Sequence, residues 1–261
     1  MSRPPRHRRA APVRPRQLAG VALLGAALAA LPVALAGAVP STAAGLTAPS
    51  DSPTSRPSGP RSLVPTVTTT GTSSQLITVR SRGTRATVTA LRRTATGWQR
   101  VLTTRFGRVG VGGVVPWNQR RQLSGTTPAG DFAMTETFGV APNPGTRMRY
   151  RHLTRCDWWD QDTRSRNYNN RVNVCRTRPD FPLTERGRYG SEHLARHAAI
   201  YRWAVVIDFN RPNPVRGRGA GIFLHVNNSR ATTGCVSVPY RTMRAILRWL
   251  NPASNPRITI R

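Results

Sequence analysis

The sequence predicts a mostly β domain with a few helices, and two observations carry this prediction. Residues 75–80 and 86–91 alternate apolar and polar side chains on either side of a turn at 81–85, which is typical of a β-hairpin. Helical spacing of apolar side chains is clear only once, after Pro239. Many strands and one clear helix therefore make up the expected domain.

The other strands continue the alternating or apolar pattern along the chain. They are expected at 98–103, 132–135, 204–209, 222–225 and 258–260. We expect the last of them to lie at an edge of the sheet. The helix follows Pro239 and ends before Pro252, because its apolar side chains recur at i, i+3, i+4 and i+7; these are Met243, Ile246, Leu247 and Leu250.

Three segments differ in composition. Residues 1–38 combine an arginine-rich start, an uncharged apolar run and small residues at 34–38, as a cleaved secretory signal peptide does. The alternative is an uncleaved membrane anchor, because 18–39 carry no charge and are long enough to cross a bilayer. Residues 39–72 are rich in Pro, Ser and Thr and predict a disordered linker, while 73–261 suit one domain.

Residues 221–239 place an imidazole and a thiol at the two ends of a short loop. His225 ends one apolar run, and a turn then leads to Cys235 at the start of the next strand. An imidazole that accepts the thiol proton yields a nucleophilic thiolate. The pair predicts a cysteine acyl-transfer site, with Cys235 as nucleophile, His225 as base and rapid alkylation of the thiol below pH 8. The alternative is a small buried hydrophobe beside a structural histidine.

The turn between these two residues supplies further candidates. The amide N–H groups of Gly234 and Cys235, together with Thr233, are expected to stabilise an oxyanion. Thr232 and Asn227 are the candidate substrate-binding residues. No cofactor is expected, and no metal: His193 and His197 lie four apart after Glu192, but the residue that follows His193 is not the glutamate of a zinc motif. These three residues are interpreted as a solvated helix surface.

Residues 221–225 (GIFLH) followed by 233–236 (TGCV) are similar to the signature of the L,D-transpeptidase (YkuD-type) catalytic domain. Residues 125–132 (GTTPAGDF) resemble its Thr-Pro-x-Gly-x-Phe segment, and 201–210 resemble a strand of actinobacterial secreted members. The resemblance covers about 74–239 and implies a β-sandwich or barrel. It also implies that a backbone carbonyl, rather than a third side chain, orients His225.

Two positions depart from the family's pattern. Thr233 and Ser237 stand where the commonest members have a second histidine and an arginine or asparagine, and the loop from His225 to Cys235 is shorter. The chain therefore resembles a divergent member, in which recognition of a substrate carboxylate by that arginine is missing.

The resemblance implies acyl transfer on peptidoglycan stem peptides through a Cys235 thioester, with an amine as acceptor for crosslinking or water for L,D-carboxypeptidase activity. A noncatalytic wall-binding module of the same fold is the alternative. Secreted cysteine peptidases of the NlpC type fit less well, because their cysteine precedes its histidine.

Cysteine usage and charge agree with an exported, wall-associated protein. Cys156 and Cys175 flank a polar segment and are expected to form a disulfide, although their spacing does not exclude pairings with Cys235. The formal net charge is +30 and every basic residue is arginine, which favours binding to anionic wall polymers. Export argues against a nucleic-acid partner, and a membrane is expected only if the N-terminal segment stays uncleaved.

Overall fold

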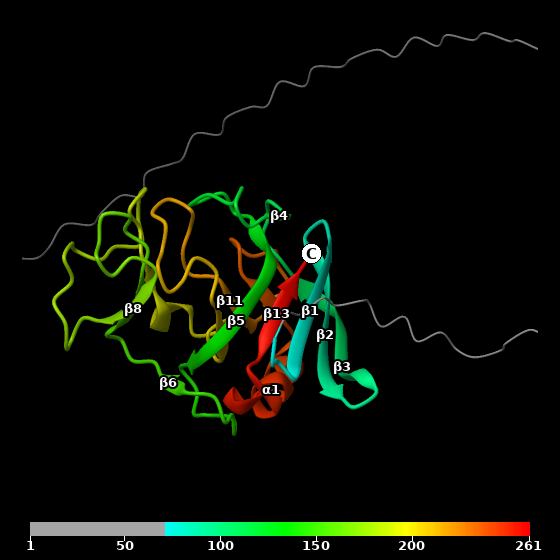
Figure 1. Ribbon diagram of the computed structural model, residues 1–261. Helices are drawn as coiled ribbons and strands as arrows, with labels where there is room; N and C mark the ends of the chain where they lie inside the picture. The colour runs from blue at the N-terminus through cyan, green and yellow to red at the C-terminus, as the bar shows by residue number, and fades with distance from the viewer. Residues whose placement is uncertain (1–70) are drawn as a thin grey trace, which may run out of the picture. The chain divides into compact units, whose positions relative to one another are not determined.

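The computed structural model describes residues 71–261, and strands from both ends of this segment meet in one sheet (Figure 1). The expected signal segment, 1–38, lies outside the described residues. The expected linker, 39–72, also lies outside them apart from its last two residues. No helix within 71–261 is long and apolar enough to span a membrane.

The main sheet closes on itself. Its strands are β1 (Gln75–Arg82), β2 (Arg85–Thr94), β3 (Gly97–Arg108), β4 (Val114–Pro116), β5 (Thr127–Gly139), β6 (Tyr150–His152), β10 (Ala204–Ile207), β11 (Phe223–Val226), β12 (Val236–Val238) and β13 (Arg257–Ile260). They follow the order β10-β11-β12-β3-β2-β1-β13-β5-β4, with β6 beside β5. Because β5 also pairs with β10, the sheet is barrel-like, and the expected mostly β fold is confirmed.

The predicted hairpin is present as β1 and β2, which pair antiparallel around a turn between Arg82 and Arg85. Val79 lies opposite Val88, and both side chains are buried in the core. The alternating pattern thus predicted both the pairing and the buried face. β3 continues the sheet beyond the predicted strand, whereas β10 ends at Ile207, two residues earlier than expected.

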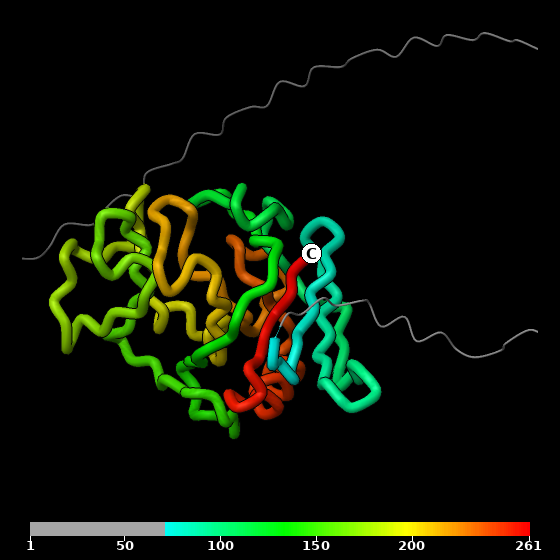
Figure 2. Tube along the Cα trace, viewed as in Figure 1, coloured from blue at the N-terminus to red at the C-terminus, as the bar shows by residue number. Residues whose placement is uncertain are grey.

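The sequence predicts an edge position for the last strand, but the structure places this strand inside the sheet. β13 lies between β1, which it parallels, and β5, to which it is antiparallel. Figure 2 shows this C-terminal strand between the beginning of the described chain and its middle. Ile258 and Ile260 are fully buried in the main core.

A smaller sheet of three strands carries one wall of the site described below. It consists of β7 (Asp157–Asp160), β8 (Asn170–Asn173) and β9 (Glu192–His193), in the order β8-β7-β9, and the 3-10 helix η1 (Leu194–His197) follows β9. A disulfide joins Cys156 and Cys175 across the ends of the β7–β8 hairpin. It leaves Cys235 as the free cysteine of the chain.

The α-helix lies where the sequence predicted it. α1 (Tyr240–Trp249) begins after Pro239, and a short 3-10 helix, η2 (Pro252–Ser254), follows it. Met243, Ile246 and Leu247 are buried in a core that also contains side chains from one face of β11 and β12. The opposite face of these two strands belongs to a second apolar cluster that includes Phe223 and Cys235. The helix therefore supports the two strands from behind the thiol.

Candidate active site

The thiol of Cys235 lies just before β12, at the floor of a polar cavity. The residue is 6% exposed, and its sulfur accepts a hydrogen bond from the backbone N–H of Phe223 at 3.4 Å. The thiol donates to the carbonyl of Gly221, also at 3.4 Å. Both partners lie on or next to β11, so the neighbouring strand fixes the position of the sulfur.

A network of threonine hydroxyls holds the turn that precedes Cys235. Thr232 Oγ1 donates to the carbonyl of Cys235 at 2.6 Å and accepts from the N–H of Gly234 at 3.1 Å. Thr127 Oγ1, from β5, donates to the carbonyl of Gly234 at 2.7 Å. The GTTPAGDF segment that we singled out in the sequence thus anchors this turn.

Gly234 occupies a position that few other residues tolerate. Its φ is +142°, and a Cβ there would lie 3.0 Å from the carbonyl oxygen of Thr126 and 3.2 Å from Nη2 of Arg120. The glycine therefore allows the backbone to approach the wall of the cavity closely.

His225 lies on β11 with its ring oriented by the backbone. Its Nδ1 is 2.8 Å from the carbonyl oxygen of Val226. Because a carbonyl only accepts, Nδ1 carries the proton and Nε2 has a free lone pair. Burial lowers the pKa of His225 to about 4, so the ring is neutral at neutral pH.

The thiol and the imidazole share one face of the sheet without a direct hydrogen bond between them. His225 pairs with Ser237 across β11 and β12, and Cys235 precedes Ser237 by two residues. The hydroxyl of Ser237 is buried and has no hydrogen-bond partner within the described residues.

Tyr201 links the two groups, a role that no pattern in the sequence indicates. Its ring packs edge-on against His225 with the centroids 5.5 Å apart. Its hydroxyl donates to Oε1 of Glu192 at 2.6 Å, and it lies close enough to Cys235 to lower the pKa of the thiol. Tyr201 is therefore the shared neighbour of the thiol, the imidazole and a carboxylate.

The expectation for Glu192 is wrong, because this residue lies in β9 and its carboxyl lines the cavity rather than a solvated helix surface. Desolvation raises its pKa. His193 is bonded through Nε2 to the carbonyl of Arg155, and His197 is paired with Glu185 at 2.8 Å. Residues 71–261 hold no group of three or more His, Cys, Asp or Glu placed to bind a metal ion.

Arg120 forms the wall of the cavity opposite Glu192 and Tyr201, and no pattern in the sequence singles it out. Only 4% of the residue is exposed, yet it has no carboxylate partner within the described residues. Instead Nε donates to the carbonyl of Thr126 at 3.1 Å, and Nη1 donates to those of Arg121 and Arg218 at 3.3 and 3.1 Å. The fully buried Phe209 ring lies 5.5 Å from its guanidinium.

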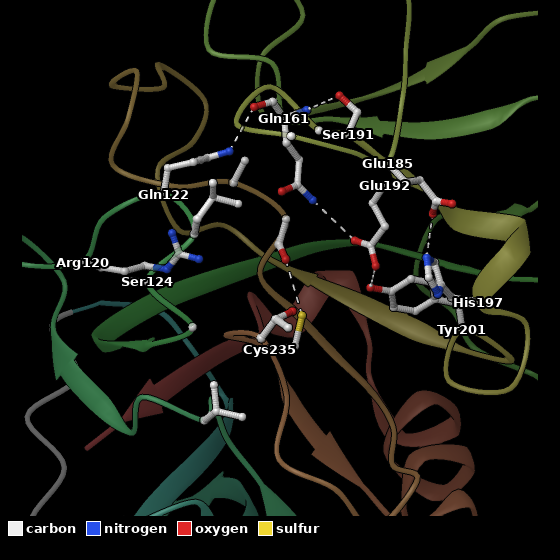
Figure 3. A pocket seen from close by; sticks show the side chains of 18 residues that line it. Arg120, Gln122, Ser124, Gln161, Glu185, Ser191, Glu192, His197, Tyr201 and Cys235 are labelled. Carbon is white, nitrogen blue, oxygen red and sulfur yellow. Dashed lines mark hydrogen bonds and ion pairs between the residues drawn. The ribbon is translucent and has the colours of Figure 1, made fainter. Parts of the chain in front are cut away.

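These walls enclose a cavity of about 570 Å³ that reaches Cys235. In Figure 3, Arg120 and Ser124 lie on one side of Cys235, and Glu192 and Tyr201 lie on the other. Thr233 also lines the cavity, as expected for a residue that meets substrate. The structure therefore provides a thiol, a guanidinium and carboxyl groups around a space large enough for a peptide segment.

Asn227, a candidate substrate-binding residue, lies outside the cavity. Its side-chain amide donates to the carbonyl of Phe106 on β3 at 2.7 Å, and it is not part of the cavity lining. The hydroxyl of Thr232 is engaged within the turn, as is the N–H of Gly234. Of the candidate residues in this loop, Thr233 and Cys235 are the ones whose atoms face the cavity.

Burial favours the protonated thiol, which argues against the reactivity expected below pH 8. Burial raises the pKa of Cys235 to about 12, and the nearby charge of Glu192 acts in the same direction. The N–H of Phe223, the charge of Arg120 and the hydroxyl of Tyr201 favour the thiolate but do not reverse the shift. Desolvation in a closed site outweighs these contacts.

Alkylation of the folded protein by iodoacetamide is therefore expected to be slow at pH 7–9 and to accelerate about tenfold per pH unit above this range. Below the pKa of a thiol, its thiolate fraction grows tenfold with each pH unit. Glu192→Gln removes a like charge and is expected to shift the profile to lower pH. Because Cys235 is the free cysteine, intact mass measures its alkylation alone. A rate that levels off below pH 8, as for an unhindered thiolate, would contradict this assignment.

The closed sheet and the free thiol at its cavity define a β domain with a candidate cysteine site. The family model of the L,D-transpeptidase catalytic domain (YkuD) matches residues 80–260, and the chain belongs to this family. The match confirms the resemblance and the fold that it implied.

No curated protein matches the chain. Among solved structures, it is similar to Bd1075 of Bdellovibrio bacteriovorus, with 14% sequence identity and a TM-score of 0.36. The match covers 72% of this chain and 47% of the other, so this chain spans about half the length of that protein.

Proposed function

We propose that the protein is an exported cysteine acyltransferase that acts on peptidoglycan stem peptides at the cell wall. The observation that carries the proposal is the free thiol of Cys235, which the turn at 232–234 holds at the floor of the cavity. The family match to a domain that acts on wall peptides supports the substrate class.

The reaction begins with attack of the Cys235 sulfur on a peptide carbonyl. A carbon–sulfur bond forms, the thiol proton passes to Nε2 of His225, and the carbon–nitrogen bond to the terminal residue breaks as its nitrogen takes that proton. The thioester then reacts with an amine, which regenerates the thiol. With water as the acceptor, the same intermediate gives a carboxypeptidase.

His225 is the candidate base because its Nε2 is unprotonated. The hydrogen bond from Nδ1 to Val226 leaves Nε2 free, and the ring is neutral at neutral pH. Since no hydrogen bond joins the ring to Cys235, proton transfer requires the two side chains to approach each other. Tyr201 is a neighbour of both groups.

Stabilisation of the oxyanion falls to the N–H of Cys235 and the hydroxyl of Thr233. The N–H of Gly234 donates to Thr232 within the turn, so it is available only if this hydrogen bond opens.

The protein's arginines provide its contact with the wall. Without the six arginines of residues 1–38 the formal net charge is still +24, which attracts anionic polymers at long range, independently of the site. Export rests on the sequence of residues 1–38.

The purified chain is expected to convert tetrapeptide muropeptides into crosslinked or trimmed products, identified by mass. Cys235→Ala should abolish product, because the acyl-enzyme needs the sulfur. A noncatalytic wall-binding module is the second candidate, favoured by Thr233 and Ser237 at the two divergent positions and by the absence of a hydrogen bond between His225 and Cys235. Binding of muropeptides without any product or covalent intermediate would support that candidate and refute the enzyme.

A further inference from the structure

Two uncompensated charges of opposite sign face the thiol from opposite walls of the cavity. Arg120 is on one side and Glu192 on the other (Figure 3). No ion pair joins them, and neither has another ion-pair partner within residues 71–261. Glu185, the other carboxyl in the lining, is already paired, with His197 and with Arg196.

The free edge of the Arg120 guanidinium lies next to the nucleophile. Nε and Nη1 are used by backbone carbonyls, whereas Nη2 donates no hydrogen bond within the described residues. Nη2 lies 3.2 Å from the position where Gly234 would carry a Cβ. A buried guanidinium with unused donors is matched by a carboxylate, which accepts charge-assisted hydrogen bonds from it.

Glu192 presents the complementary group. Oε1 accepts from Tyr201 at 2.6 Å, and Oε2 has only the side-chain amide of Gln161, at 3.5 Å. Desolvation disfavours the ionised carboxyl, so a cation that enters the cavity would gain a partner and relieve this cost. An ammonium group is the cation that a peptide substrate brings.

We propose that Arg120 and Glu192 bind the two charged ends of one zwitterionic ligand, the carboxylate at Arg120 and the ammonium at Glu192. A simple anion would leave Glu192 without a partner, and a simple cation would leave Arg120 without one. The inference deepens the proposed function, on which it rests: the stem peptide held beside Cys235 carries a free carboxylate and, on a side chain, a free amine. Ser237 stands where the commonest members of the family have an arginine or asparagine. In this chain Arg120 supplies a guanidinium from another part of the sequence instead.

The test measures binding rather than turnover. The Cys235→Ala chain is titrated calorimetrically with three ligands. They are the tetrapeptide muropeptide, a form whose peptide carboxylates are amidated, and a form whose free peptide amine is acetylated. Loss of one charge-assisted contact weakens binding by about 10- to 100-fold. Amidation and acetylation are each expected to weaken binding by this factor.

Two variants in the Cys235→Ala background then assign each contact. With Arg120→Gln, amidation should no longer matter while acetylation still does; with Glu192→Gln the pattern should reverse. Arg121→Gln removes the same charge from a residue that does not line the cavity, so it should respond as the parent does. If Arg120→Gln fails to fold, Arg120→Lys and the modified ligands on the intact cavity still decide the question.

The two proposals fail separately. Equal binding of all three ligands overturns the zwitterion site even if the native chain makes product. Selective binding without product from the native chain preserves the site and refutes the transferase.

Discussion

Replacing His225 by alanine is expected to slow acylation of Cys235 by about 10²- to 10⁴-fold, the range that a positioned general base contributes. The reason is the fixed tautomer: Nδ1 donates to Val226, so Nε2 is the basic atom that the variant loses. The resting thiol is protonated, since its pKa is raised to about 12, and it needs a base at the moment of attack. Acyl-enzyme formation, followed by intact mass after rapid quenching, measures the rate.

The pH profile has a defined direction. The pKa of His225 is lowered to about 4, so the ring loses its basic lone pair only as the pH falls through this value. Acylation by the native chain should therefore persist to about pH 5 and decline below it.

Two matched variants identify the base. His225→Asn keeps a side-chain donor for the carbonyl of Val226 but has no basic nitrogen, so it should be as slow as His225→Ala. Tyr201→Phe removes only the hydroxyl that lies between Glu192 and the thiol. A loss below about fivefold for His225→Ala together with a large loss for Tyr201→Phe would transfer the role to the tyrosine.

The parts of the fold that the sequence predicted are those with local causes. The β1–β2 hairpin follows from alternation around a short turn, and α1 from apolar spacing between two prolines. Closure of the sheet by β5 and β10, and the central place of β13, depend on partners far away in sequence. No local pattern carries that information.

The same distinction explains the site. Cys235 and His225 lie in one short loop region, and their residue types alone indicate chemistry. Arg120 differs from its neighbour Arg121 in no way that the sequence shows, and only folding buries one of them beside the thiol. The sequence predicts a helix surface at Glu192 because the adjacent His193 lies four residues before His197, whereas the short pairing of β9 with β7 decides its conformation.

The aromatic cluster beside the thiol gives the largest expected effect on stability. Phe223→Ala should lower the free energy of unfolding by about 3–5 kcal/mol, as a deleted buried aromatic ring does. Phe223 is 0% exposed, and its ring meets those of Phe138, Trp159 and Tyr201 with centroids 5.0, 4.8 and 5.7 Å apart. Denaturant unfolding followed by tryptophan fluorescence measures the change.

Phe106→Ala is the matched control, because it deletes the same ring from a site that is 76% exposed and should change the free energy by less than about 0.5 kcal/mol. Equal effects for the two variants would show that the cluster contributes no special stability. The cluster also positions the chemistry, since the backbone N–H of Phe223 donates to the Cys235 sulfur and its ring supports Tyr201. A cavity at Phe223 should therefore reduce acylation even under conditions where the variant remains fully folded.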